Sequence, residues 1–527
     1  MNEQSSENVK FGRMRSSGAH ARVATELALT APVSLQTEAF APASVDGNVT
    51  NGSVRDTSSV TQSINSHLHG ASNRSLSNVE RPGRAWLSTV AATVIALASG
   101  QSSLSVAAPA APAATATDST PLAFPGAVGW AAHTPGGRGG KIIKVTTLAP
   151  NGPGSFIEAV ETKGPRIIVF EVGGVIDLNR QTVRIREPYL TIAGQTAPSP
   201  GITLIRGGMD IYGHDVIVQH IRIRVGTTGA PQFGNVDFDA ISTIAAHDVI
   251  VDHCSLTWAT DENLSASGPR FTGKTPDEWR EGTSHRITFS NNIIAEGLAH
   301  ASHIKGEHSK GSLIHDNVSD ILIIGNLYSH NKERNPLFKG GVRGAVVNNL
   351  IYDPGDKATH YNLIAEEWVD HEKQLGHMTL IGNVYRAGIS TRPELPLFMI
   401  GGSGDMELYS SDNIMVDWIG RPVAEQGRYT NAAAGTLKAK RPMLPPGLKV
   451  LSSKEVQDSV IQNAGARPWD RQLDGNDWRI VADAIESRGY VINSEADVGG
   501  YPVQVPTVGQ FDPEQWDLNT MTKKSGG

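Results

Sequence analysis

Cysteine is nearly absent from this sequence of 527 residues, which contains a single one, Cys254. A lone cysteine excludes an internal disulfide, and it excludes a zinc site built from two or more cysteines. Because Cys254 lies in an apolar, strand-like run, we expect a small buried hydrophobic residue there rather than a nucleophile. The lack of disulfides leaves secretion open, since a large core is stable without them.

Positive charge is also scarce. The chain has 46 Lys and Arg against 53 Asp and Glu, which gives a formal net charge of -7. This balance provides no general attraction to nucleic acid or to an anionic membrane, so we expect no nucleic-acid partner. An anionic polymer would bind only through local cations or through a bound metal ion.

The first 122 residues show little apolar periodicity. Residues 1–80 are rich in Ser, Asn, Thr, Gly and Ala, which predicts a disordered N-terminal extension. Residues 81–110 combine a basic start, an apolar middle and a small-residue end, as in a secretory signal peptide or signal anchor. The apolar run is too short for a comfortable transmembrane helix. Residues 111–122 form an Ala/Pro linker.

The position of this signal segment is unusual, because a signal peptide should begin the chain. One hypothesis is that translation starts near Val79 at a non-Met codon, so that the preceding residues are not made. The alternative is a signal anchor with a long cytoplasmic tail. We predict secretion to the extracellular space or the periplasm, and no stable membrane partner unless the signal segment stays uncleaved.

From residue 123 to about 425 the sequence is built of short apolar runs with alternation, broken by Gly, Asn, Asp and Pro. Long helical patterns are scarce, so the sequence predicts an all-β domain. The clearest runs are 141–145, 166–170, 216–223, 249–256, 287–294, 321–327, 345–351 and 378–384.

The apolar runs repeat, and an asparagine lies near the end of several of them. Asn292, Asn326, Asn349, Asn383 and Asn413 are separated, by subtraction, by 34, 23, 34 and 30 residues. Such periods indicate a solenoid or a propeller, and the varying spacing favours a parallel β-helix with variable loops. Stacked asparagines can hydrogen-bond their copies in neighbouring coils. The alternative is an ordinary sandwich with chance asparagine positions.

Residues 426–527 are less regular. The sequence predicts one short helix over residues 478–488, followed by extended chain. We expect this C-terminal extension to pack along the coil and to help cover its edge.

Two groups of charged residues are candidates for a site. The acidic group is Asp237, Asp239, Asp261 and Glu262. Asp237 and Asp239 are two residues apart, so on a strand both would point to one face, and stacking of the next coil would add Asp261 or Glu262. Converging carboxylates suit Ca²⁺, a hard cation that prefers oxygen ligands, although the spacing does not match an EF-hand.

The basic group is Lys310, Arg334, Lys339 and Arg343. If the coil repeats, these residues lie one or two turns beyond the acidic group. A face rich in carboxylates beside a cationic face suits an acidic polysaccharide, whose carboxylates would be bridged by metal and paired with Lys or Arg.

Several segments resemble the pectate lyases of polysaccharide lyase family 1. The segment Val249-Ile250-Val251-Asp252-His253 is similar to that family's Asp-His signature, and the segment from Arg334 to Gly341 is similar to its Arg-x-Pro segment. The segment around Asp237 and Asp239 resembles the first calcium-binding segment. These similarities run in the family's order across roughly residues 124–420. Parts of residues 465–502 also resemble the C-terminal region of some bacterial and fungal members.

The resemblance implies a right-handed parallel β-helix and calcium-assisted β-elimination on polygalacturonate, a de-esterified pectin. Arg334 matches the catalytic base, Lys310 the lysine that contacts the substrate carboxylate, and Lys339 a second cation. Asp261 matches the third calcium carboxylate, whereas its usual acidic partner four residues on is Ser265 here. Glu262 is therefore our substitute candidate for the fourth ligand.

The chemistry implied by the resemblance is reasonable for these residues. The C5 proton of a uronic acid lies α to a carboxylate, and cations stabilise the charge that develops when it leaves. Arginine is normally protonated, but the neighbouring calcium and lysine charges favour loss of its proton. We therefore expect an alkaline optimum.

Other interpretations remain open from the sequence. A β-helix glycoside hydrolase would need paired carboxylates, which the acidic group imitates. A calcium-independent pectin lyase and a non-catalytic carbohydrate-binding β-helix are further alternatives. His300, His303, His308, His315 and His330 crowd this region, and we favour groove-lining or core roles over a transition-metal site because no HExxH spacing occurs. We expect a monomer.

Overall fold

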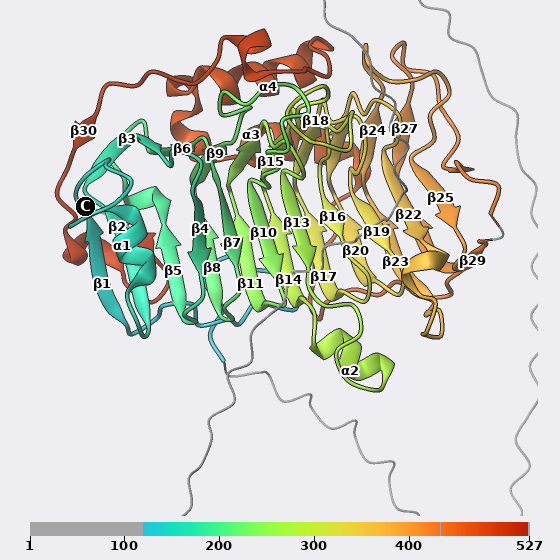
Figure 1. Cartoon of the computed structure of the whole chain (residues 1–527), viewed down its shortest axis with the longest axis horizontal. Coiled ribbons are helices and arrows are strands. Elements are labelled where there is room, and N and C mark those ends of the chain that lie inside the picture. Colours follow the sequence, from blue (N-terminus) through green and yellow to red (C-terminus); the bar gives the residue numbers. More distant parts are fainter. Residues whose placement is uncertain (1–119, 433, 525–527) are drawn as a thin grey trace, which may run out of the picture. The chain divides into compact units, whose positions relative to one another are not determined.

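Three parallel sheets wrap around a common interior in the computed structural model, which describes residues 120–432 and 434–524 (Figure 1). The chain passes from the first sheet to the second and then the third, and each full turn adds one strand to every sheet. The predicted all-β parallel β-helix with a less regular C-terminal extension is confirmed.

The strands of each sheet follow one another in chain order, except that β30 pairs with β3. The first sheet contains β1 (Lys141–Val145), β2 (Arg166–Phe170), β5 (Leu190–Ala193), β8 (Val216–Gln219), β11 (His247–Asp252), β14 (His285–Ser290), β17 (Ser319–Ile324), β20 (Arg343–Val347), β23 (Gly376–Ile381), β26 (Met406–Ser411) and β29 (Thr436–Lys438). The second sheet contains β3 (Val172–Asp177), β6 (Ile202–Ile205), β9 (Ile221–Arg224), β12 (Ser255–Thr257), β15 (Ile293–Ala295), β18 (Leu327–Ser329), β21 (Leu350–Tyr352), β24 (Val384–Arg386), β27 (Ile414–Val416) and the antiparallel β30 (Thr507–Val508).

The third sheet is the shortest of the three among the described residues. It contains β4 (Thr182–Ile185), β7 (Gly208–Ile211), β10 (Ile241–Ile244), β13 (Leu264–Ser267), β16 (Leu313–Ile314), β19 (Leu337–Lys339), β22 (Thr359–Leu363), β25 (Phe398–Gly402) and β28 (Gln426–Arg428). A separate hairpin near the C-terminus pairs β31 (Trp516–Asp517) with β32 (Thr522–Lys523).

Helical segments are few in the described part of the chain and lie outside the coil interior. The α-helices are α1 (Phe156–Glu161), α2 (Pro276–Glu281), α3 (Ser453–Asn463) and α4 (Gly475–Glu486). The 3₁₀ segments are η1 (Gly194–Thr196), η2 (Ala365–Glu367), η3 (Pro468–Leu473), η4 (Glu495–Val498) and η5 (Pro513–Gln515).

Each longer apolar run bends between the first and second sheets. The run at 216–223 contains β8 and β9, and the run at 249–256 contains β11 and β12, with a corner between them. The corner residues His220 and His253 have φ of 57° and 48°, and Asn291 has φ of 54°. Asn and His tolerate this left-handed region better than most residues, so one run makes two strands and turns sharply.

The predicted asparagine ladder forms at this corner. The Asn292 Nδ2 group donates to Asn326 Oδ1 at 3.0 Å, and Asn326 Nδ2 donates to Asn349 Oδ1 at 2.9 Å. The contacts continue through Asn383 to Asn413 at 3.1 Å each. The backbone N–H of each asparagine from Asn292 to Asn383 also donates to the next asparagine side chain, as from Asn326 to Asn349 at 2.9 Å. The ladder therefore satisfies polar groups that these corners bury.

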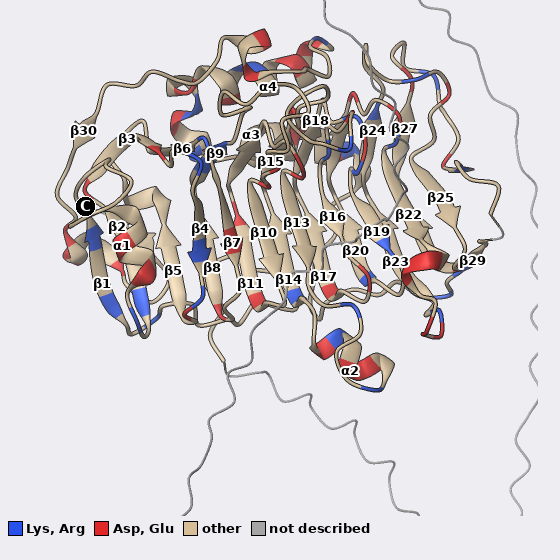
Figure 2. Cartoon of the chain, in the orientation of Figure 1, with Lys and Arg blue, Asp and Glu red and all other residues tan. Residues whose placement is uncertain are grey.

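The interior of the coil is filled by apolar side chains stacked in register. Val216, Val249, Ile287 and Ile321 occupy equivalent positions on neighbouring strands of the first sheet and are fully buried. Cys254 is buried in the same core, as predicted. Figure 2 shows that most of the strand length carries no charge, whereas charged residues gather in loops and at strand ends. Burial of uncharged strands is the main source of stability here.

The C-terminal extension runs back over the coil from the β29 end toward β1 (Figure 1). Asp477 of α4 accepts from Arg222 Nε at 3.0 Å and from Arg224 at 2.9 Å, and Asp474 accepts from Arg224 at 2.6 Å. All four side chains are almost fully buried against the second sheet. Removing either partner would leave a buried charge without compensation, so these ion pairs hold the extension on the coil.

Three sequence expectations differ from the structure or lie outside it. The coil continues through β28 and β29, so its boundary with the extension falls after residue 438 rather than at 425. The extension contains two α-helices rather than one, and α4 begins at Gly475 because the Asp474 side chain caps Asp477 N–H at 2.9 Å.

The disordered extension (1–80), the signal segment (81–110) and residues 111–119 of the linker lie outside the described residues. Within the described residues, no helix combines the length and apolar character needed to span a membrane.

Replacement of Asn326 by Leu tests the ladder. The substitution strands the buried Asn292 N–H and the Phe289 carbonyl, which both bond to the Asn326 side chain. We expect the free energy of unfolding to fall by roughly 2–4 kcal/mol, measured by denaturant titration. The matched control is Asn413→Leu at the partly exposed end of the ladder. Equal losses at the two positions would contradict the role of the buried ladder.

Candidate active site

Three carboxylates converge at the edge of the third sheet, just before strands β10 and β13. Oxygen atoms of Asp239, Asp261 and Glu262 all lie within 4.8 Å of one another. Asp239 and Glu262 belong to adjacent coils, and the Ala240 N–H donates to the Glu262 carbonyl at 3.0 Å. Coil stacking thus brings together residues that are more than twenty positions apart in the sequence.

Asp239 is held by donors on the next coil. Its Oδ1 accepts the Glu262 N–H at 2.9 Å, and its Oδ2 accepts the Ser265 hydroxyl at 2.5 Å. Burial, and then the nearby Asp261 charge, raise the pKa of Asp239 well above its ordinary value of 3.8. The site therefore carries more negative charge than its own hydrogen bonds stabilise, a condition that a bound cation relieves.

Asp261 is oriented by two buried histidines. His308 Nε2 lies 2.9 Å from Asp261 Oδ1, and His303 Nε2 lies 3.7 Å from Oδ2. Burial raises the pKa of Asp261, but the His308 hydrogen bond and the histidine charges outweigh it, so the pKa is lowered. The His303 Nδ1 atom accepts the Lys305 N–H at 3.1 Å. The proton of neutral His303 therefore sits on Nε2 and faces Asp261, which favours a supporting role over metal ligation by that nitrogen.

Arg334 lies two coils beyond Asp261 and Glu262 and three beyond Asp239, in the turn that leads into β19. Its φ of 65° places the residue in the left-handed region of backbone conformations. The guanidinium forms an ion pair with Glu262, and its side chain is 22% exposed. Burial lowers the pKa of Arg334, while the charges of Asp261 and Asp239 oppose that shift. A partly buried guanidinium with a lowered pKa is closer to acting as a base than an exposed one.

A charge ladder runs beside Arg334. Glu262, Lys310 and Glu333 pair in parallel on successive coils, so acidic and basic residues alternate. The Lys310 ammonium is buried and ion-paired with Glu333, which also pairs with Lys357 on the following coil. Burial opposes ionisation of Glu333, but the Lys310 charge and then those of His360 and Lys357 hold the pKa of Glu333 well below its usual range. Glu333 thus fixes Lys310 next to the carboxylates.

Lys339 lies on β19 at a different height on the third sheet. Its buried ammonium is ion-paired with Glu367 and lies 3.5 Å from Asp316 Oδ2. Arg270 reaches the same two acids, at 3.1 Å from Glu367 and 3.0 Å from Asp316. Lys339 therefore shares its charge with acids of the protein, and a substrate carboxylate would have to displace one of them.

A groove of about 380 Å³ follows the outer face of the third sheet. Its lining contains the carboxylates of Asp239, Asp261 and Glu262 together with Ser265 and His315. Outward-facing residues of neighbouring strands align along it, because Ser242 pairs with Ser265 in the parallel register. An elongated chain could therefore lie across several coils and meet one residue from each.

Two predicted site residues are not brought to the three-carboxylate group. Asp237 is exposed and precedes β10 rather than lying in a strand, so strand alternation does not align it with Asp239. Arg343 lies on β20 of the first sheet, because the turn at Gly340 and Gly341 carries the chain off the third sheet. Arg343 therefore faces away from the groove, and its role in substrate binding is not supported.

Comparison with known proteins shows relatives of one kind. A protein called probable pectate lyase C from Aspergillus oryzae is 31% identical over 387 residues, which cover 72% of this chain and 81% of that protein. The chain belongs to the pectate lyase family. A second protein of that name from Aspergillus terreus is 36% identical over 271 residues, which cover 51% of this chain and 55% of that relative. No protein-family model matches the sequence.

Solved structures that resemble the coil of this chain have low sequence identity to it. The cedar pollen allergen jun a 1 is 18% identical over 64% of this chain and 92% of its own, with a TM-score of 0.45. A pectate lyase bound to a hexasaccharide is 15% identical over 67% of this chain and all of its own, with a TM-score of 0.43.

Sequence reasoning missed several polar residues around the pectate lyase family site, chiefly Glu333, Lys357, Arg270 and Glu367. Glu333 and Lys357 are 24 residues apart, close to the 23-residue spacing of Asn326 and Asn349 on the same two coils. That spacing would have predicted their pairing. Arg270 and Glu367 come from loops that interrupt the repeat, so no periodic signal marks them.

Substitution of Ser265 by Asp tests whether the three carboxylates hold calcium. Ser265 stands where the family pattern has a carboxylate, and its hydroxyl already contacts Asp239. An added carboxylate should tighten Ca²⁺ binding at least roughly tenfold, since affinity follows the charge count of the ligands. Isothermal titration at alkaline pH is the suitable measurement, because the raised pKa of Asp239 makes protons compete with calcium as the pH falls.

Ser267→Asp is the matched control for this experiment. Ser267 lies two residues further along β13 on the same face and also lines the groove. We expect little change in calcium affinity at this position. Equal tightening by both variants would indicate a general charge effect instead of a site at Asp239, Asp261 and Glu262.

Proposed function

We propose that this protein is a polysaccharide lyase that cleaves polygalacturonate by calcium-assisted β-elimination. The observation that carries the proposal is the placement of Arg334, a partly buried arginine with a lowered pKa, beside three converging carboxylates in a chain of the pectate lyase family. A base next to an oxygen-rich cation site is what removal of a proton α to a carboxylate requires.

Asp239, Asp261 and Glu262 are the residues that would hold the calcium ion. Their oxygen-only donor set and the raised pKa of Asp239 fit a hard divalent cation. When bound, calcium supplies positive charge that withdraws electron density from the uronate carboxylate. We assign no calcium role to Asp237, which is exposed and is not part of the group of converging carboxylates.

In the proposed reaction, neutral Arg334 takes the C5 proton of a uronate residue. The electron pair left at C5 forms the C4–C5 double bond, the bond from C4 to the glycosidic oxygen breaks, and that oxygen is protonated by solvent. Glu262 favours the protonated form of Arg334 through their ion pair. Arg334 therefore acts as a base only when Glu262 is engaged by another cation, and activity should rise toward alkaline pH.

Lys310 and Lys339 are the proposed contacts for substrate carboxylates. Lys310 is fixed by Glu333 one coil beyond Glu262, so its ammonium lies at the height where the reacting uronate carboxylate would bind. Lys339 would bind a neighbouring unit by exchange with Glu367. A lysine provides charge at these points but not the two-pronged geometry of arginine.

Activity of Arg334 variants tests the proposal directly. Arg334→Ala and Arg334→Lys should lower kcat on polygalacturonate by about 10³-fold, the contribution expected of a general base. The measurement is the ultraviolet absorbance of the unsaturated product with and without Ca²⁺. Arg343→Ala is the matched control and should retain activity, since Arg343 lies on the first sheet.

The outcomes of that assay separate the alternatives. Bond cleavage without an unsaturated product would identify a glycoside hydrolase, and activity that survives full chelation on methylated substrate would identify a pectin lyase. Full activity of Arg334→Ala would remove Arg334 from the mechanism. Polymer binding without any cleavage would identify a carbohydrate-binding β-helix.

Glu333→Gln tests the arrangement around Lys310. Without the Glu333 charge, the buried Lys310 ammonium loses the ion pair that holds it in place. We expect KM for polygalacturonate to rise several-fold. Asp356→Asn is the control, because Asp356 is half exposed and pairs with Lys332. An unchanged KM in Glu333→Gln would show that this ion pair does not position a substrate contact.

Secretion and a monomeric state belong to the same proposal. A polysaccharide of the plant cell wall lies outside the cell, so the enzyme must reach it there. Light scattering and N-terminal sequencing of native material test these two points.

A further inference from the structure

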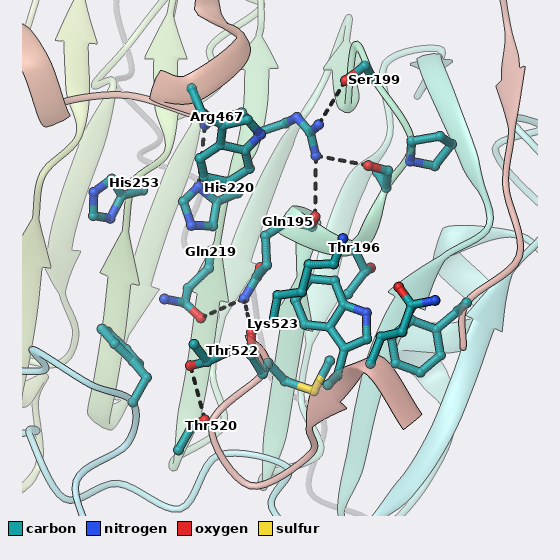
Figure 3. A pocket seen from close by; sticks show the side chains of 18 of the residues that line it. Gln195, Thr196, Ser199, Gln219, His220, His253, Arg467, Thr520, Thr522 and Lys523 are labelled. Carbon is teal, nitrogen blue, oxygen red and sulfur yellow. Dashed lines mark hydrogen bonds between the residues drawn. The ribbon is translucent and has the colours of Figure 1, made fainter. Parts of the chain in front are cut away.

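The sequence segments that resemble the pectate lyase family do not all lie at the groove. Asp252 ends β11 and His253 follows it at the corner between the first and second sheets, whereas the three carboxylates and Arg334 lie at the edge of the third sheet. Together with Gln219 and His220 on the preceding coil, they line a pocket of about 680 Å³ (Figure 3). The proposed lyase mechanism uses none of these residues.

The floor of this pocket, which we call the corner pocket, is a fixed polar surface. Asp252 accepts from Gln219 at 3.1 Å, from Ser290 at 2.8 Å and from Asn291 at 3.1 Å, and its Oδ2 lies 2.7 Å from His253 Nδ1. Its charge is thus satisfied within the protein. The Asp252 charge outweighs burial and raises the pKa of His253.

Several polar atoms in the corner pocket have no partner in the described part of the chain. His220 Nδ1 accepts the Arg467 N–H at 3.3 Å, so the proton of the neutral ring is on Nε2, for which no hydrogen bond is found among the described residues. Gln195 Oε1 is buried and unpaired there as well. The Lys523 side chain lines the same pocket and makes no ion pair with any described residue. The pocket therefore offers donors, an acceptor and a positive charge.

Aromatic rings form the walls of the corner pocket. Trp469 is 55% exposed, and its ring lies 4.9 Å from the His220 ring and 5.1 Å from the Arg467 guanidinium. Arg467 is held by Asp470 at 2.5 Å and by the Ala197 carbonyl at 2.8 Å, so it fixes Trp469 rather than binding a ligand. Trp516 lines the same pocket from the end of the C-terminal extension.

This combination suits a sugar that carries a carboxylate. The apolar C–H face of a pyranose ring packs on an exposed indole, while its hydroxyls require both donors and acceptors. A carboxylate on the ring would be paired by Lys523. Of the two acids in the lining, Asp252 is paired with His253 within the protein. Asp512 is exposed to solvent and accepts the Glu514 N–H at 3.0 Å.

We propose that the corner pocket is a second saccharide-binding site, which takes one or two units of an acidic sugar chain and lies apart from the cleaving groove. The pocket chemistry specifies a uronate, and the choice of galacturonate as that uronate rests on the proposed function. Because the two sites lie on different faces of the coil, a polymer can occupy both at once. The corner pocket then holds the enzyme on its substrate between cleavage events.

The test is binding of digalacturonate to the full chain with the substitution Arg334→Ala and Lys310→Ala, in buffer without calcium. These substitutions remove two of the proposed groove contacts, and Lys339 stays paired with Glu367. Binding that depends on Trp469, measured by calorimetry or tryptophan fluorescence, therefore reports the corner pocket. We expect binding to persist, to weaken at least tenfold on further Trp469→Ala substitution, and to weaken on Lys523→Ala. Trp478→Ala, at an equally exposed tryptophan of α4, is the control and should leave binding unchanged.

Each result either supports or overturns the second saccharide-binding site. Loss of all binding in the groove variant, or equal binding with and without Trp469 and Lys523, overturns the second site. Lys523 is exposed on the terminal hairpin, so its variant keeps the test valid if Trp469→Ala fails to fold. If the wild-type chain forms no unsaturated product yet binds digalacturonate through Trp469, the proposed lyase function fails while the saccharide site stands.

Discussion

The structure depends on closing a sharp corner in every coil without leaving polar groups unsatisfied. A residue with positive φ, such as His253 or Asn291, turns the backbone between the first and second sheets. From Asn292 to Asn383 the corner asparagine donates to the asparagine of the next coil, so these corners stabilise their neighbours. Coils can therefore differ in loop length while their strands stay in register. That register lets residues from distant parts of the sequence meet at fixed heights on the third sheet.

Regular features of the sequence predicted the fold well. The asparagine spacing and the short apolar runs indicated a parallel β-helix, and the ladder lies where those residues placed it. Coil stacking also predicted that Asp239 would meet Asp261 and Glu262. Position along the chain was a poor guide where a turn intervened: Arg343 follows Lys339 by four residues but belongs to another sheet. Charge alone gave no sign of that change.

The ion pairs within the site were also not predictable from the sequence. The sequence predicted Lys310 and Lys339 as contacts for substrate, but it did not predict that each is buried against an acid from another coil or loop. The corner pocket was also beyond reach, because its walls come from the C-terminal extension, which has no repeat. Contacts such as Arg467 with Gln195 join segments 272 residues apart. Only the three-dimensional path of the extension brings Trp469 and Trp516 to that corner.

The buried ion pairs between β9 and α4 have a consequence for the order of events during synthesis of the chain. Arg224 leaves the ribosome 250 residues before Asp474, its partner under the extension. During that interval the nascent coil carries two arginines on a face that will later be sealed from water, and they must stay hydrated. The early coils thus remain open on one side until the last fifth of the chain arrives. The fold is complete only after the C-terminal extension has been synthesised and has packed on the coil.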